Sequence, residues 1–156
     1  MEIKRIITVT VLNEHGVLSR ISGLFAGRGY NIESLTVAPI FDTNLSRITI
    51  TTQGDKKVLE QILKQLHKLI PVLKVLEDER IIEKESVLVK FSNKESLSEL
   101  TAIFASYNGK MLEVNEKFAI FMACDCHTRI NGLLQAIQTY KPKDITRSGI
   151  AAIEAN

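Results

Sequence analysis

The stretch that decides the fold is IKRIITVTVLNEHGVLSRISGLFAGR, residues 3–28. Its first ten residues are mostly β-branched or apolar, which is typical of a buried strand. The polar NEHG at residues 13–16 indicates a turn, and the apolar residues after it recur at helical spacing to about residue 28. Gly29 is a typical helix stop. The chain is therefore predicted to open with a strand, a tight turn and a helix.

The next fifty residues complete a unit. Residues 31–40 and 45–52 alternate like the two strands of a hairpin connected by FDTN. Asp55 is the expected N-cap of a second helix, and Pro71 separates that helix from a final strand at residues 72–76. The order strand, helix, strand, strand, helix, strand is the ferredoxin-like split βαβ arrangement, in which two helices cover one face of the sheet.

The same order repeats in the second half. SLSE at residues 96–99 predicts a capping box that starts a helix ending at Asn108-Gly109, and Thr128 is expected to cap another helix that ends before Pro142. The expected strands are residues 85–91, 111–114, 117–124 and, as a weak last strand, 145–153. The predicted fold class is α+β, with two tandem ferredoxin-like βαββαβ domains at residues 1–78 and 79–156, joined by a charged linker at 77–80.

Composition limits the classes of function. Of the 156 residues, 45% are hydrophobic and 24% are charged, which fits a packed globular chain and excludes a disordered one. The net charge of +2 does not favour a nucleic-acid partner. The longest apolar run, residues 118–124, is far shorter than the ~20 residues of a membrane helix. With no signal-peptide pattern at the start, the expected location is the cytoplasm.

Catalytic and metal motifs are weak. The two cysteines, Cys124 and Cys126, are too few for a disulfide framework and favour a reducing compartment. The run Cys124-Asp125-Cys126-His127 suggests a metal cluster. Strand alternation, which would put both cysteines on one face, favours buried strand cysteines instead. Acidic residues are expected on solvent faces. The sequence has no G-x-S-x-G motif, no Walker loop and no G-x-G-x-x-G motif. The chain is therefore predicted to have no catalytic site and no metal site.

Two further expectations follow from the topology. RNA-binding domains of this topology stack bases on sheet aromatics. The strands at residues 3–12 and 45–52 contain none, so nucleic acid is not expected as a ligand. Domains of about 70–80 residues bury only roughly 60% of their chain surface. A homodimer that continues the sheet across a two-fold axis is therefore expected.

The turn before the first helix has features of a binding site. Gly16 permits an unusual backbone angle and close approach of a ligand. The helix that follows offers unpaired N–H groups and a partial positive charge to a carboxylate. Asn13 provides both a donor and an acceptor, which suits an amino-acid zwitterion. The alternative is that Asn13 and Gly16 only shape the turn, and the residues alone favour this simpler interpretation.

Longer stretches carry a family resemblance. LNEHGVLSR (12–20), GLFAGRGYNIESLTVAP (23–39), LSRITI (45–50) and VLEQILKQLHKL (58–69) closely resemble the regulatory small subunit of acetolactate synthase (acetohydroxyacid synthase). Residues 1–78 resemble its amino-acid-binding ACT domain. The second half is a weaker match, through SVLVK (86–90) and RSG (147–149).

The resemblance implies a regulatory function in valine, leucine and isoleucine biosynthesis. Members of the family bind a catalytic large subunit, raise its activity and make it sensitive to feedback by valine. Thiamine diphosphate, Mg and FAD are expected on the catalytic subunit and not on this chain. Valine is expected between two ACT domains. The matching positions are Asn13, Gly16, Val17 and Leu18 of one protomer with Asn31 and Ile32 of the other.

The predicted pocket also indicates which amino acid should bind best, and two other functions remain as alternatives. An apolar pocket formed by Val17, Leu18 and Ile32 would distinguish side chains that differ by one methylene by only about 1–3 kcal/mol, so leucine or isoleucine would bind more weakly than valine. One alternative is a free-standing amino-acid sensor that controls another enzyme or a transcription factor. A second, an acylphosphatase-like hydrolase, lacks an arginine loop to hold the anion.

Overall fold

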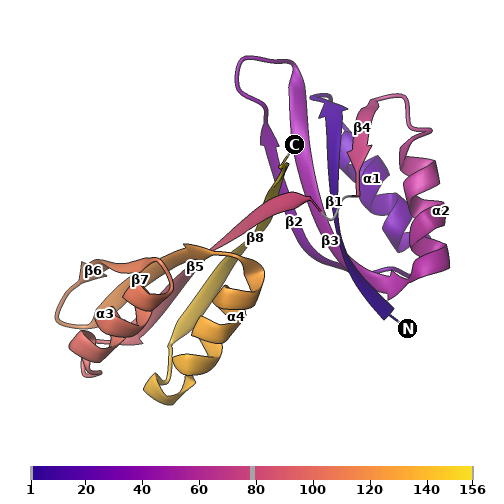
Figure 1. Ribbon diagram of the computed structural model, residues 1–156. Coiled ribbons are helices and arrows are strands. Elements are labelled where there is room, and N and C mark those ends of the chain that lie inside the picture. The colour runs from indigo at the N-terminus through magenta and orange to yellow at the C-terminus, as the bar shows by residue number, and fades with distance from the viewer. Residues whose placement is uncertain (1, 78–79, 156) are drawn as a thin grey trace. The chain divides into compact units, whose positions relative to one another are not determined.

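The computed structural model describes residues 2–77 and 80–155 (Figure 1). The chain divides into two compact units, one made mainly of the residues up to Ile82 and the other of Glu83–Gly149. Each unit is built around a four-stranded sheet, with strand orders β2-β3-β1-β4 and β6-β7-β5-β8. These orders confirm the predicted α+β class with two ferredoxin-like domains.

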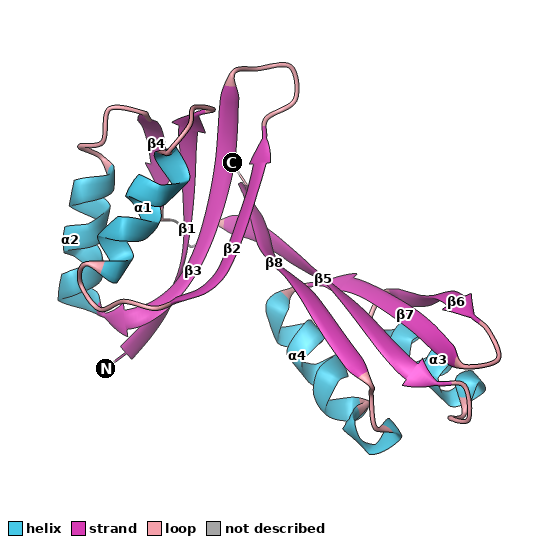
Figure 2. Cartoon of the chain, turned by 180° about the vertical axis from the view of Figure 1, so that it is seen from behind, coloured by secondary structure: helices cyan, strands magenta, loops and turns pink. Residues whose placement is uncertain are grey.

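The N-terminal domain packs two helices on one face of its sheet (Figure 2). Its elements are β1 (Glu2–Leu12), α1 (Val17–Ala26), β2 (Ile32–Pro39), β3 (Leu45–Asp55), α2 (Lys56–Leu66) and β4 (Val72–Leu76). Alternate residues of β1 and β3 face the helices and are buried, among them Ile7, Val9 and Ile50 at 0% exposure. Each such side chain contributes about 2 kcal/mol by leaving water, and this strand periodicity fixes which face carries the helices.

The C-terminal domain repeats this plan around an aromatic core. Its elements are β5 (Ile81–Ser92), α3 (Leu97–Ser106), β6 (Gly109–Val114), β7 (Phe118–Asp125), α4 (His127–Ala136), a short 3₁₀ helix (Gln138–Tyr140) and β8 (Asp144–Glu154). Phe91 meets Phe104 and Phe121 edge-on, with ring centroids 6.1 and 5.8 Å apart. Aromatic pairs prefer this geometry because ring edges and faces carry opposite partial charges.

Several local predictions are wrong. Ser96 is the N-cap of α3, but its side chain makes no capping hydrogen bond, so the capping box does not form. Helix α4 begins at His127, with Cys126 and not Thr128 as N-cap. Cys126 therefore follows β7, and the two cysteines do not share a strand face. The last strand, expected at residues 145–153, is confirmed as β8, and it is longer than predicted, at 11 residues.

The linker between the domains is untested, whereas the predicted cap of α2 is confirmed. The predicted linker falls partly on residues 78 and 79, which lie outside the described residues, and the domain boundary after residue 78 stays a prediction. Asp55 is confirmed as the N-cap of α2, because its carboxylate accepts a hydrogen bond from the Lys57 N–H at 2.8 Å. None of the helices in the described ranges is long and apolar enough to cross a membrane.

Candidate functional site

The turn between β1 and α1 depends on a left-handed glycine. Gly16 is the N-cap of α1 with φ 81° and ψ −5°. A Cβ added there would meet nothing within 4 Å. Glycine is therefore favoured by the backbone angle and not by lack of space, since other residues enter this region only at a cost of about 1–2 kcal/mol. The unusual angle predicted for Gly16 is confirmed.

The first turn of α1 keeps its N–H groups free of acidic side chains. Gly16 supplies no side-chain cap, and the turn contains no acidic residue. The first intrahelical hydrogen bond is donated by the Arg20 N–H to the Gly16 carbonyl at 3.1 Å. The preceding N–H groups point out of the helix end, where the aligned peptide dipoles leave a partial positive charge. This arrangement suits a carboxylate ligand.

The other α-helices in the described part of the chain each have a carboxylate at or near their start. Asp55 caps α2, and Glu99 lies in the first turn of α3. At α4 the carboxylate comes from another element: the His127 N–H donates to both oxygens of Glu83 on β5, at 3.0 and 3.2 Å. Helix α1 therefore differs from the rest in leaving its positive end to water or to a ligand.

The remaining predicted residues at this end differ in their exposure. Asn13 is exposed, and its backbone N–H donates to the Asn44 carbonyl at 2.9 Å. Leu18 is 40% exposed, whereas Val17 is buried in the domain core at 5%. The structure thus brings Asn13, Gly16, Val17 and Leu18 together, with Leu18 as the accessible apolar side chain among them.

Asn31 and Ile32 lie at the opposite end of the same sheet. Thr52 of β3 pairs with Ile32 on one side and with Arg5 on the other. Leu12, where β1 ends, is seven residues beyond Arg5, which corresponds to about 23 Å along a strand. Asn31 is exposed and Ile32 is half-buried. One chain therefore cannot bring the six predicted residues into a single pocket.

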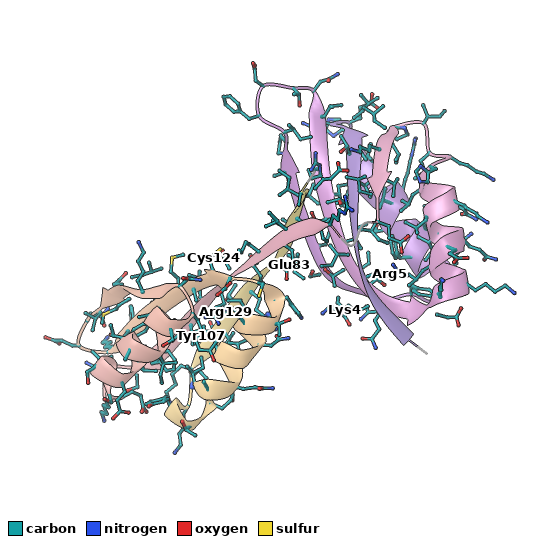
Figure 3. The ribbon with its side chains drawn as sticks, viewed as in Figure 1. Lys4, Arg5, Glu83, Tyr107, Cys124 and Arg129 are labelled. Carbon is teal, nitrogen blue, oxygen red and sulfur yellow. The ribbon has the colours of Figure 1, made fainter. Side chains whose placement is uncertain are left out.

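The C-terminal domain contains a charge network at one end of its sheet. Glu85 and Asp125 are paired residues of β5 and β7, and each is 3% exposed. Arg147 donates through both Nε and Nη2 to Glu85, and the Nδ1 of His127 lies 2.9 Å from the same carboxylate. Arg129, the neighbour of Tyr107 in Figure 3, makes an ion pair with Asp125.

These contacts lower the pKa of both buried carboxyls. Burial alone raises the pKa of Glu85, but hydrogen bonds from Arg147 and His127 outweigh it and hold the pKa below its usual range. Hydrogen bonds from Arg129, Lys84 and the Cys126 N–H hold the pKa of Asp125 well below its usual range. Both groups are therefore ionised at neutral pH, and the cations around them compensate their charge.

Sequence analysis missed this network because it expected acidic residues on solvent faces. The signal was nevertheless present in the strand alternation. Glu85 shares its parity with the buried Val87 and Val89, and Asp125 shares its parity with the buried Phe121 and Ala123. In each strand, the next inward-facing position after these buried apolar residues is an acidic residue. Asp125 forms ion pairs with Lys84 and Arg129.

Comparison with known proteins decides the family. Residues 7–74 match the model of the AHAS small subunit-like ACT domain, and residues 84–156 match the model of the small subunit of acetolactate synthase. The chain belongs to the acetolactate synthase small-subunit family. The resemblance inferred from residues 12–69 is thus confirmed, and the family extends over the second half as well.

Relatives in the acetolactate synthase small-subunit family align over nearly their full lengths. The acetolactate synthase small subunit of Buchnera aphidicola subsp. Baizongia pistaciae is 41% identical, over 97% of this chain and 98% of its own. The isozyme 3 small subunit of Escherichia coli is also 41% identical, over 96% and 94%. The crystal structure of the Thermotoga maritima small subunit superposes with a TM-score of 0.85 at 31% identity, covering 97% of both chains.

Proposed function

We propose that this chain is the regulatory subunit of acetolactate synthase. In this role it binds a catalytic large subunit, activates it and makes it sensitive to valine, the product of the pathway. Thiamine diphosphate, Mg and FAD are then bound by the catalytic subunit, and the complex acts in the cytoplasm. The family of the chain supports the regulatory role. The single observation that supports an amino-acid effector is the open N-terminus of α1.

The proposed site is formed by a homodimer of the N-terminal domains. The effector carboxylate accepts hydrogen bonds from the first N–H groups of α1. The side-chain oxygen of Asn13 accepts a hydrogen bond from the ammonium group of the effector. Leu18 of one protomer, with Asn31 and Ile32 of the other, surrounds the branched side chain. Two copies are required because Ile32 lies about seven residues of strand away from Leu12 within one chain.

Regulation then follows from linkage. An effector held by two protomers binds more tightly to one of two arrangements of the dimer. It changes the activity of the catalytic subunit only to the extent that the two arrangements bind valine with different affinities. Because the coupling is reciprocal, binding of the catalytic subunit changes the affinity for valine by the same factor.

The test is Asn13→Ala in the reconstituted holoenzyme. Loss of the amide leaves the effector ammonium underpaired at a cost of about 1–3 kcal/mol, so valine inhibition should require roughly five- to 150-fold more valine. Activation of the catalytic subunit should persist. Glu14→Ala, an exposed change in the same turn, is the matched control and should keep the original inhibition. Unchanged valine inhibition in Asn13→Ala would refute the assignment.

A further inference from the structure

The face of the N-terminal sheet opposite α1 and α2 is lined with hydroxyl side chains. On β1, Ile7 and Val9 belong to the core beneath the helices, so Thr8 between them points the other way. Thr8 pairs with Thr49 of β3, and Thr49 pairs with Thr36 of β2, so three threonines form one row across three strands. We call this side of the sheet the hydroxyl face. Antiparallel sheets commonly leave such a polar face in water.

The hydroxyl face is nevertheless almost completely buried. Thr8 is 3% exposed, Thr49 is 2% exposed, and Thr51, two residues further along β3, is 1% exposed. The two helices lie on the other face, so another segment of the same compact unit must cover these side chains. Besides the sheet and its helices, this unit contains residues 80–82 and 150–155. We call residues 150–155 the strap.

The strap has one side that is turned to the sheet. Ile150 and Ala152 are 1% and 8% exposed, yet neither is among the side chains that form the two described cores. Glu154, at the next position of the same alternation, makes an ion pair with Lys74 of β4 at 2.8 Å. Lys74 is on the hydroxyl face, because it pairs with Thr10 of β1. Strand alternation therefore turns the buried side of the strap to the hydroxyl face.

The strap encloses polar groups that it does not pair. The side-chain oxygens of Thr8, Thr36 and Thr51 are closed off from water, and none has a hydrogen-bond partner in the described part of the chain. The same is true of Nε of Arg47. A buried polar group without a hydrogen bond raises the free energy of the closed arrangement, because the group is hydrogen-bonded in water. The partly exposed ion pair of Lys74 offsets little of this cost.

A left-handed glycine stands immediately before the strap. Gly149 has φ 81° within β8. The residues before it belong to the C-terminal unit, where Ile145 packs on the core and Arg147 donates to Glu85. A left-handed glycine inside a strand is typical of a β-bulge, at which the strand bends and its pairing is interrupted. The strap can therefore leave the sheet while the first part of β8 keeps its contacts.

We propose that the strap is a reversible cover, which detaches from the hydroxyl face while both domains stay folded. The burial of Ile150 and Ala152 favours the closed arrangement, and the hydration of the hydroxyl groups favours the open one. Because these terms oppose each other, the two arrangements differ little in free energy. A molecule with several hydrogen-bonding groups that binds the hydroxyl face would favour the open arrangement. This inference does not depend on the proposed function.

Thiol labelling of the full chain measures the opening directly. Cys124→Ser and Cys126→Ser first remove the two free thiols. Thr8→Cys then places one thiol on the hydroxyl face. In a second chain, Val9→Cys places one on the helix face, where the native side chain is 0% exposed. Iodoacetamide should label the first thiol at least about 100-fold faster, because the second becomes accessible only when the domain unfolds.

Two further changes, each combined with Thr8→Cys, should alter the closed arrangement in opposite directions. Glu154→Gln weakens the contact with Lys74 and should speed labelling about two- to fivefold. Thr51→Val removes an unpaired hydroxyl and should slow labelling about fivefold. Glu60→Gln, at an exposed position on α2, is the matched control for Glu154→Gln and should leave the rate unchanged.

The labelling rates decide the inference. Equal rates for the Thr8→Cys and Val9→Cys chains, whether slow or fast, would overturn it, because the hydroxyl face would then open only together with the core. A rate that stays the same or rises after Thr51→Val would also overturn it, since the hydroxyl groups would then not oppose closure. Faster labelling on the hydroxyl face, with opposite effects of the two further changes, would support a reversible strap.

Discussion

The N-termini of α1 and α4 differ in whether a carboxylate of the chain accepts hydrogen bonds from their first N–H groups. Both helices begin after a strand and present N–H groups with a partial positive charge. In the C-terminal domain the chain satisfies this end itself, because the Glu83 carboxylate accepts from the His127 N–H. In the N-terminal domain Gly16 leaves the end of α1 without a side-chain cap. The difference is the one expected if the C-terminal domain uses its helix end for stability and the N-terminal domain uses its own for the proposed effector.

The largest expected effect comes from breaking the network beside α4. Glu85→Ala leaves Arg147 and His127 without their shared carboxylate in a place that is 3% exposed. Removal of one partner of such a pair should destabilise the domain by about 3 kcal/mol. Urea unfolding of the full chain measures the change. Glu113→Ala, an exposed position on β6, is the control and should shift the midpoint very little.

Acid should weaken the same domain. The pKa values of Glu85 and Asp125 are lowered in the folded chain, so their stabilisation is fully present above the unfolded value of about 4. It is lost as the pH falls through the lowered folded values. Amide signals of the C-terminal core should therefore broaden in NMR spectra below about pH 4. A C-terminal domain as stable at pH 3 as at pH 7 would be inconsistent with the ionised network.

A smaller loss of stability is expected when the Glu83 carboxylate is removed from the N-terminus of α4. Glu83→Ala removes the acceptor of the His127 N–H and should destabilise α4 by about 1 kcal/mol. Glu83→Gln keeps an acceptor oxygen but removes the charge, so its effect should be about half as large. Thermal unfolding in low salt gives the comparison, and equal stability of all three chains would show that Glu83 does not stabilise the helix.

The smallest change in stability is expected when a carboxylate is added at the N-terminus of α1. Ser19→Glu places a carboxylate in the first turn of α1, where the chain has none, and should stabilise the free protein by about 0.5 kcal/mol. The same change should weaken valine binding several-fold, because the new carboxylate competes for the same N–H groups. Ser19→Gln is the neutral control. Calorimetric titration that gives one valine affinity for both variants would contradict the proposed site.

Much of the fold follows from local patterns, whereas the network and the complete site depend on distant contacts. Strand alternation and helical spacing predicted both domains. Asp55 caps α2 and Gly16 adopts the predicted backbone angle, because caps and backbone angles are local. The cap of α4 was missed because Glu83 lies 44 residues from His127. Asn31 and Ile32 reach the proposed site only through a second chain, which no pattern within one sequence specifies.

The most direct test compares the two helix ends in one NMR titration of the isotopically labelled chain with valine. We expect the backbone amide signals of Val17, Leu18 and Ser19 to move with rising valine until the site is saturated. The amide signal of His127 should stay in place, because Glu83 already occupies that helix end. Saturable shifts at His127, with none at the first turn of α1, would show that valine does not bind at the proposed site.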